Sequence, residues 1–398
     1  MLAITKDLLG TEKHLLQRKP AGILAWDNHL SSDFLTLGNV EGAISINSAF
    51  EIFRVKLPSI IPEEFQSAMT AIDVTEVVIP WYLVVPREKY IISIKNMLET
   101  LWDLFSKLQQ SSYLQTYVTI NKFIKCMQCA HINSIKLEEY IKNEKNPSII
   151  STLVSFQPCH DGMTKKVSYN NSHTVTGRLI VQDGPKILTL PAHCRDIIKS
   201  RYEGGSILEI DFKSLEPRIA LILAGKDPPI DVYDEISNKL FSDQLKRSEV
   251  KIAVLCALYG ASPRKLGEIL DNRFNASEVI AQIKAYFCYS DITNVLRHNY
   301  ERDGFISNMF GRPIFCENSR DNILYSNFVQ STAADAAILG FKKLLNQVYF
   351  TSEDIIPLFM IHDALILDVK CDDEIAVSHN FVELNNIGKL YFEQLCIT

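Results

Sequence analysis

The sequence predicts an α+β protein in which a sheet built from distant strands is joined to long helical segments. The apolar run Ile207–Ile210 and the two runs within Pro357–Val369 have the length and composition of strands. Apolar residues repeat every three or four positions between residue 94 and about residue 145, which is helical spacing, and residues 322 to about 348 are also expected to be helical. Residues 1–95 carry short strand-like runs between prolines, so we expect a separate small α/β domain there.

The composition is that of a globular protein. The chain has 398 residues, of which 47% are hydrophobic and 22% charged, which suits two or three domains. No stretch approaches the roughly 20 apolar residues that span a bilayer, and the N-terminus lacks signal-peptide features, so we expect a cytoplasmic protein with no membrane partner. The net charge is −6, whereas nucleic-acid-binding proteins are usually basic. Any site for a polyanion must therefore be a local patch.

The nine cysteines are scattered along the chain, which favours a reducing compartment over a disulfide framework. Cys126 and Cys129 have metal-ligand spacing, with His131 close by and Cys159–His160 as the remaining ligands of a hypothetical zinc site. The alternative is a pair of thiols on one helix face.

The N-terminal domain shows no catalytic constellation. Its aspartates, Asp27, Asp33 and Asp73, are expected to be turn and cap residues. We expect its strands at Ile23–Trp26, Ala43–Ile46, Val77–Ile79 and Trp81–Val85.

A carboxylate lies at the expected end of the 207–210 strand. Asp211 follows the apolar run, and Ser214 is the expected N-cap of a helix over Ser214–Ala224 with Pro217 in its first turn. Glu216 adds a second carboxylate just beyond the strand. Such a pair can serve a metal site, although a strand that ends in Asp is more often a turn or cap.

A helix predicted within residues 242–262 presents an ordered face. Arg247, Lys251, Leu255 and Tyr259 are four residues apart, so they share one side of the helix, and Gly260 then ends it. Two cations, an apolar side chain and a ring match the phosphates, sugar and base of a nucleotide. The alternative is an amphipathic helix whose two cations reach into solvent.

The Pro357–Val369 stretch predicts a β-hairpin with His362 and Asp363 at its tip. A carboxylate with apolar residues on both sides must be paired or must bind a cation. Two other arginines, Arg178 after Gly177 and Arg312 after Gly311, lie in predicted loops. Arg178 offers a planar fork of donors for a phosphate or base edge, and the alternative is an ordinary surface arginine.

Five motifs follow one another along the chain. In order they are T-x-T-G-R-L from 174, D-x-x-x-x-E-x-R from 211, R-x-x-x-K-x-x-x-x-x-x-x-Y-G from 247, Q-x-T-A-A-D from 330 and H-D at 362–363. Their order and spacing resemble the family A DNA polymerases, the group of bacterial DNA polymerase I and many phage replicases. The resemblance covers roughly residues 95–398.

The resemblance implies a right-hand polymerase fold with an antiparallel palm sheet and helical fingers and thumb. Residues 1–95 would be a small α/β domain, either a vestigial exonuclease or a docking module, since they are too few for a full exonuclease domain. The implied parts are the thumb at 96–155, the palm at 156–231 and 318–398, and the fingers at 232–317.

The resemblance also assigns a catalytic centre. Asp211 and Asp363 match the palm carboxylates that hold two Mg²⁺ ions, for which Mn²⁺ is a substitute, and Phe212 would add its main-chain carbonyl as a metal ligand. Lys251 would be a catalytic proton donor to the departing pyrophosphate. The implied nucleotide-binding residues are Arg247, Lys251, Leu255, Tyr259, Glu216 and Tyr233. The implied primer–template contacts are Arg178, Thr176, Gln330, His362, Gly260 and Arg312.

Four departures from the family pattern concern selectivity more than reaction class. Leu255 stands where an aromatic residue is usual, and Ala364 replaces the glutamate that normally follows H-D. Tyr233 stands where a histidine is common. Lys213 and Ser214 replace small and amide residues.

We therefore expect a template-directed DNA polymerase that adds deoxynucleotides to a primer 3′ end by two-metal phosphoryl transfer, without its own proofreading. Glu216 matches the residue that blocks a ribose 2′-hydroxyl. The expected partners are primer–template DNA and dNTPs, while a helicase or primase, a processivity factor and a separate proofreading subunit stay open. The short chain favours a phage or viral origin, with the protein acting in the host cell.

Two other functions stay open at this point. One is a single-subunit RNA polymerase, against which Glu216 argues. The other is a catalytically weak, polymerase-like subunit that only binds primer–template, motivated by Ala364, Leu255 and the acidic net charge.

Overall fold

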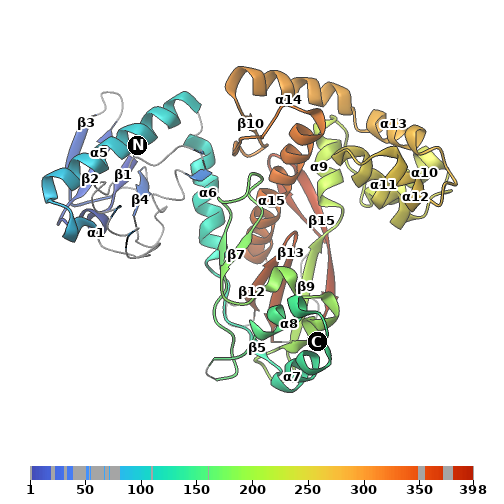
Figure 1. The fold of residues 1–398 in the computed structure, drawn as a ribbon, viewed down its shortest axis with the longest axis horizontal. Helices are drawn as coiled ribbons and strands as arrows, with labels where there is room; N and C mark the ends of the chain where they lie inside the picture. The colour runs from blue at the N-terminus through green and yellow to red at the C-terminus, as the bar shows by residue number, and fades with distance from the viewer. Residues whose placement is uncertain are drawn as a thin grey trace. The chain divides into compact units, whose positions relative to one another are not determined.

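The computed structural model consists of two compact units, Met1–Thr119 (unit 1) and Ile120–Thr398 (unit 2) (Figure 1). It describes residues 2–18, 23–30, 34–38, 51–52, 54, 67, 71, 81–108, 111–159, 161–347, 355–370 and 380–397. The domain boundary expected at residue 95 differs from this division. Helix α5, Arg87–Leu108, runs through that position, because Ile94, Leu98 and Leu101 share one buried face that packs into the core of unit 1.

Unit 1 contains a mixed four-stranded sheet in the order β3-β2-β1-β4. Strand β1 pairs antiparallel with β2 and parallel with β4, and β2 pairs antiparallel with β3. The strands are β1 (Leu2–Ile4), β2 (His14–Arg18), β3 (Ile23–Asp27) and β4 (Leu35–Leu37). The helices with most of their residues in this unit are α1 (Lys6–Leu9), α4 (Trp81–Val84), α5 (Arg87–Leu108) and α6 (Ser111–Ile124).

The predicted strands of this unit had mixed outcomes. The strand at Ile23–Trp26 is confirmed as β3. The strand at Trp81–Val85 is wrong, because these residues form helix α4; a short apolar run fits a helix as well as a strand. Asp27 accepts a hydrogen bond from the backbone N–H of His29 at 3.0 Å, which confirms its turn role. The other predicted strands and aspartates, Ala43–Ile46, Val77–Ile79, Asp33 and Asp73, lie outside the described residues.

Unit 2 is built on a five-stranded antiparallel sheet in the order β12-β13-β9-β15-β14 (Figure 1). This confirms the predicted sheet that contains the 207–212 strand and the 357–369 hairpin. Its strands are β9 (Ser206–Phe212), β12 (Ile355–Ile361), β13 (Ala364–Val369), β14 (Phe381–Leu384) and β15 (Gly388–Cys396).

The two faces of β9 differ, as its alternating sequence requires. Leu208, Ile210 and Phe212 point to a buried face, whereas Glu209 and Asp211 lie on a half-exposed face. On the buried face the ring of Phe212 stacks on Phe341 of helix α15 (Asp321–Gln347), with 4.4 Å between centroids. Next to it on α15, a Cβ at Gly340 would come within 2.7 Å of the Phe212 ring, so the close approach requires glycine. The opposite face of β9, which carries Glu209 and Asp211, is therefore available for a functional site.

Helices account for most of the rest of unit 2, which confirms the helical character predicted for 232–317 and 322–348. They are α7 (Ser134–Asn143), α8 (Pro147–Val154), α9 (Leu215–Leu223), α10 (Val232–Phe241), α11 (Arg247–Tyr259), α12 (Pro263–Ile269), α13 (Ala276–Tyr286), α14 (Tyr289–Asp303) and α15. The short strand pairs are β5 (His131–Ile132) with β8 (Ile198–Lys199), β6 (Ser168–Asn170) with β7 (Ile180–Asp183), and β10 (Ile306–Ser307) with β11 (Pro313–Ile314). Two 3₁₀ helices are η1 (Ile187–Thr189) and η2 (Ala192–Ile197).

Two local predictions need correction. Ser214 precedes α9 as expected, but its side chain makes no capping hydrogen bond, because the sharp turn out of β9 puts its backbone at φ 52° instead of the extended conformation of a side-chain cap. The thiols of Cys126 and Cys129 do not share a helix face, since α6 ends at Ile124. Within the described residues, which omit His160, no group of three or more His, Cys, Asp or Glu side chains is arranged to hold a metal.

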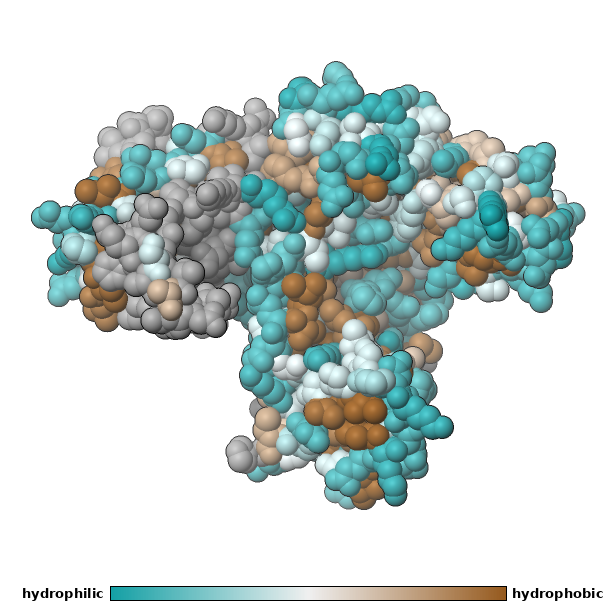
Figure 2. Space-filling view, viewed as in Figure 1, coloured by the Kyte–Doolittle hydropathy of each residue, from teal (hydrophilic) through white to brown (hydrophobic). Residues whose placement is uncertain are grey.

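The surface gives no indication of a membrane segment in the part of the chain that the structure describes. No described helix has both the length and the apolar content needed to cross a bilayer. The face shown in Figure 2 is mainly hydrophilic, with hydrophobic residues in small patches between polar ones. Small scattered patches are ordinary for a folded protein.

Candidate active site

Sheet register brings Asp211 and Asp363 together. On adjacent antiparallel strands Asp211 lies opposite Ala364, so Asp363 occupies the turn just beside the end of β9. The backbone N–H of Phe212 donates to the carbonyl oxygen of Asp363 at 3.3 Å and ties this turn to the strand. The two predicted carboxylates therefore meet at one edge of the sheet.

The two carboxylates have unusual proton affinities. The pKa of Asp211 is raised to about 7, first by burial and then by the neighbouring carboxylates, Asp363 foremost, while Lys251 acts in the opposite direction. Burial also raises the pKa of Asp363; Glu216 adds to this effect, and His362 and Arg178 oppose it. The residues predicted from separate motifs therefore lie close enough to change one another's pKa values. Two neighbouring buried carboxyl groups favour the binding of a cation, which would neutralise their charges.

Two further carboxylates surround Asp211. Glu393 on β15 lies directly opposite Asp211, and its carboxylate is 3.8 Å from the Lys213 ammonium. Glu209, two residues before Asp211, accepts a hydrogen bond from the Arg195 guanidinium at 2.6 Å, which offsets its charge. The sequence analysis missed Glu393, because no local motif marks it and only the strand register reveals its position.

The predicted cationic face is confirmed as one helix. Arg247, Lys251, Leu255 and Tyr259 all lie on α11, and Gly260 ends it in a left-handed conformation with its N–H bonded to the carbonyl of Cys256. Lys251 is exposed, and its positive charge lowers the pKa of Asp211. The α11 face and the two carboxylates therefore belong to one site.

Arg247 is held by residues at the start of α10, the helix that precedes α11. Its guanidinium pairs with Asp231 at 2.8 Å and lies over the Tyr233 ring with 5.4 Å to the centroid. Asp231 is the N-cap of α10 and accepts from the N–H of Tyr233 at 2.9 Å. Arg247 and Tyr233 are thus brought together as predicted, and Asp231 is an orienting residue that the sequence analysis missed, although its place before a helix marks it as a cap.

Glu216 connects two other predicted residues, Tyr259 and Arg178. Its carboxylate accepts hydrogen bonds from the Tyr259 hydroxyl and from the Arg178 guanidinium. Burial and the Glu216 charge raise the pKa of Tyr259, so this hydroxyl stays protonated and donates to Glu216. The network joins α9, α11 and the loop that carries Arg178.

Arg312 has a different place from the one predicted. Its side chain is buried, with the residue only 2% exposed, and its guanidinium donates to both carboxylate oxygens of Asp335 at 2.8 and 3.1 Å and to the carbonyl of Asn171 at 3.0 Å. These contacts give Arg312 a structural role, and its predicted primer–template contact stays a prediction. A Cβ at Gly177 would lie 2.3 Å from the guanidinium carbon of Arg312, so this buried group also explains the glycine before Arg178.

The contacts of the remaining predicted residues with nucleic acid stay predictions. Thr176 is buried in the loop before Arg178, and His362 is exposed at the hairpin turn with φ 54°. Leu255 on α11 and Gln330 on α15 are half-buried.

The residues present fit a hard divalent cation. Mg²⁺ takes oxygen ligands and is often held by only one or two carboxylates together with substrate phosphates and water. Asp211 and Asp363 supply that pair, and the main-chain carbonyl of Phe212 is a further oxygen donor beside them. No larger cluster of metal-binding side chains exists among the described residues, so substrate oxygens would have to complete the coordination.

Cation affinity is expected to depend on pH. Because the pKa of Asp211 is raised to about 7, a cation must displace a proton from this carboxyl at lower pH, and Mn²⁺ affinity should fall roughly tenfold from pH 8 to pH 6. Because its pKa is raised on folding, Asp211 binds a proton more tightly in the folded chain than in the unfolded chain. This difference stabilises the cation-free fold at pH values below the ordinary carboxyl pKa, and the stabilisation is lost as the pH rises through about 7. Calorimetric Mn²⁺ titrations at the two pH values test this, and equal affinities would contradict it.

Comparisons with known proteins agree with this geometry. The family model described as DNA polymerase family A matches residues 70–386. No curated protein was found to match the chain. One similar solved structure is the POL domain of Pol1 from M. smegmatis in complex with DNA primer-template and dNTP, with a TM-score of 0.56 and 14% identity over 84% of this chain and 76% of that chain.

The family match bears on the RNA polymerase alternative. It covers the residues that carry all five predicted motifs, and it supports a DNA polymerase over a single-subunit RNA polymerase. The right-hand polymerase-domain fold and its α+β class are likewise confirmed. This chain belongs to DNA polymerase family A, the DNA-directed DNA polymerases.

Proposed function

We propose that this polymerase extends a DNA primer with deoxynucleotides by phosphoryl transfer assisted by two Mg²⁺ ions. The observation that carries the proposal is the meeting of Asp211 and Asp363 at one sheet edge within the field of Lys251. The primer–template and dNTP bound in the similar solved structure support the same partners here.

The residues have distinct roles in this proposal. Asp211 and Asp363 position the ions, which when bound stabilise charge on the attacking and leaving oxygens. Lys251, exposed on α11, donates a proton to the departing pyrophosphate. Arg247, one turn earlier on the same helix, holds the triphosphate, with Asp231 and Tyr233 orienting its guanidinium in the free enzyme.

Glu216 is assigned to sugar selection. The hydroxyl of Tyr259 and the guanidinium of Arg178 fix its carboxylate on two sides, so it cannot easily turn away from a ribose 2′-hydroxyl. Replacing Glu216 with alanine is expected to reduce discrimination between dNTP and rNTP by at least about tenfold, or 1.4 kcal/mol. Single-nucleotide insertion with both substrates measures this ratio.

The matched control for this variant is Glu278→Ala, which removes an exposed carboxylate from α13. It should leave the ratio unchanged. A Glu216→Ala enzyme with the discrimination of the parent, or a parent that prefers rNTPs, would contradict the assignment. Failure of the parent to extend any primer with Mg²⁺ or Mn²⁺ would favour the non-catalytic, primer–template-binding alternative.

We further propose that the chain does not proofread. The first strand of the small sheet, Leu2–Ile4, is entirely apolar, whereas metal-dependent removal of a nucleotide needs acidic side chains on such a scaffold. A labelled mismatched nucleotide at the primer end should therefore be retained during incubation with Mg²⁺. Its release by the purified chain would refute this part of the proposal.

A further inference from the structure

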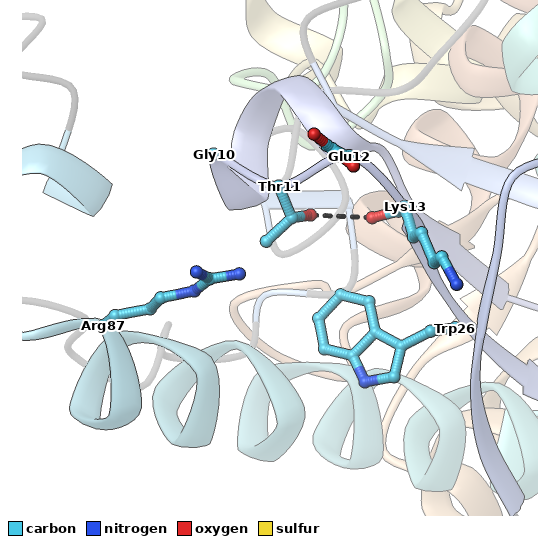
Figure 3. A pocket seen from close by; sticks show the side chains of 6 residues that line it. All are labelled: Gly10, Thr11, Glu12, Lys13, Trp26 and Arg87. Carbon is cyan, nitrogen blue, oxygen red and sulfur yellow. Dashed lines mark hydrogen bonds between the residues drawn. The ribbon is translucent and has the colours of Figure 1, made fainter.

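Unit 1 contains a cavity whose described lining includes none of the residues assigned to the polymerase centre. Its volume is about 720 Å³, and it is open to solvent (Figure 3). The lining residues are Gly10, Thr11, Glu12, Lys13, Trp26 and Arg87. They come from the loop between α1 and β2, from β3 and from the first position of α5.

One side of the cavity is aromatic. Trp26 lies opposite Leu15 in the β2–β3 register, and Leu15 is fully buried in the core of unit 1. Trp26 itself is 43% exposed, because it lies at the end of the edge strand where the cavity opens. An indole left accessible in this way offers a flat surface on which a planar group can stack.

The other sides are mainly cationic. Figure 3 shows Arg87 across the cavity from Trp26, with Thr11 between them and Lys13 on the side of Trp26. Among the described lining residues, one carboxylate, that of Glu12, stands against these two cations. Arg87 also begins a helix of 22 residues, whose N-terminal dipole adds to the attraction for an anion.

The loop that carries Lys13 has a fixed shape. The Thr11 hydroxyl donates to the carbonyl of Lys13 at 2.7 Å. Gly10 has φ 58°, and a Cβ there would lie 2.2 Å from the Tyr82 ring, so the turn before this loop requires glycine. The two cations are thus presented from defined elements on opposite sides of the cavity.

We propose that this cavity binds one nucleotide of a single DNA strand, with its base stacked on Trp26 and its phosphates held by Lys13 and Arg87. A planar ring joined to an anion matches the lining, and a volume of several hundred Å³ suits one nucleotide. A base inside a duplex has no free face for the indole, so the strand must be single. The described lining residues all belong to unit 1, whereas Asp211 and Asp363 belong to unit 2.

Photo-crosslinking of the full chain tests the proposal. The probe is an oligo(dT) strand that carries one 4-thiothymidine, and the crosslinked peptides are identified by mass spectrometry. We expect a crosslinked peptide that contains Trp26 or the loop before β2. The Trp26→Leu variant, which keeps an apolar side chain but loses the ring, should reduce this crosslink at least about fivefold.

A double variant, Lys13→Ala with Arg87→Ala, tests the phosphate contacts on an intact fold because both side chains are exposed. It should reduce the yield of crosslink to unit 1. When the logarithm of this yield is plotted against the logarithm of the salt concentration, the slope should become shallower by about 1.4. The matched control is Lys89→Ala, which removes an exposed lysine from the same helix outside the cavity and should change neither quantity.

Crosslinks that map only to unit 2, or a double variant with the parent's crosslinks and salt slope, would overturn the proposal. Free dTMP that competes as well as the oligonucleotide at equal molar concentration would also overturn it and assign the cavity to free nucleotides. The Asp211→Asn enzyme should still crosslink at unit 1, while the cavity variants should still extend primers. The proposal for the cavity and the proposal for the polymerase centre can therefore be refuted independently of each other.

Discussion

Replacing Asp363 with asparagine is expected to slow primer extension by at least about a thousandfold, which corresponds to about 4 kcal/mol of transition-state stabilisation. Asparagine has nearly the same shape but no charge. With only Asp211 left, the site could no longer position two divalent ions for an in-line displacement. The fold should survive, because the pKa of Asp363 is raised by burial and its charge therefore opposes folding in the absence of a cation.

Single-turnover insertion of one dNTP, with circular dichroism as the check on folding, measures this effect. Glu383→Gln is the matched control, since Glu383 is an exposed carboxylate on β14 of the same sheet. It should react at the parent's rate. Activity of Asp363→Asn within tenfold of the parent would mean that this carboxylate is not a catalytic metal ligand.

The second large effect concerns stability. Replacing Asp335 with alanine is expected to destabilise the protein by about 3–5 kcal/mol, because the buried Arg312 guanidinium would lose its charged partner. Asp335 is 0% exposed and also accepts from the Asn308 amide at 2.8 Å. The effect should extend to the site, since Arg312 also donates to the carbonyl of Asn171, at the start of the loop that carries Arg178.

Urea unfolding of Asp335→Ala and of a control variant tests this expectation. Arg302→Ala is the control, because it breaks an exposed pair with Asp303 and should cost little stability. Arg312→Met combined with Asp335→Leu should lose less than Asp335→Ala alone, since no unpaired charge stays buried. If Asp335→Ala and Arg302→Ala cost the same, the buried pair does not have the proposed role.

Local patterns were sufficient to predict much of the site. The face of α11 follows from a spacing of four, and the hairpin around Asp363 follows from two apolar runs on either side of a polar pair. The 81–85 segment failed because a short apolar run gives no period that separates helix from strand.

The contacts that sequence reasoning missed join distant parts of the chain. Glu393 reaches Asp211 only through the β9–β15 register. Arg312 follows a glycine in a loop, as a surface arginine would, and only the packing of α15 buries it against Asp335. The cavity at Trp26 likewise joins three separate segments, none of which carries a motif.

The central claim is that Asp211 and Asp363 share one divalent-cation centre, and the most direct test is to count the ions bound there. Mn²⁺ can be titrated by electron paramagnetic resonance into the full chain with a dideoxy-terminated primer–template and the matching dNTP. We predict two tightly bound Mn²⁺ ions in the parent complex and loss of at least one in both Asp211→Asn and Asp363→Asn. Two ions bound with the parent's affinity in either variant would contradict a shared centre.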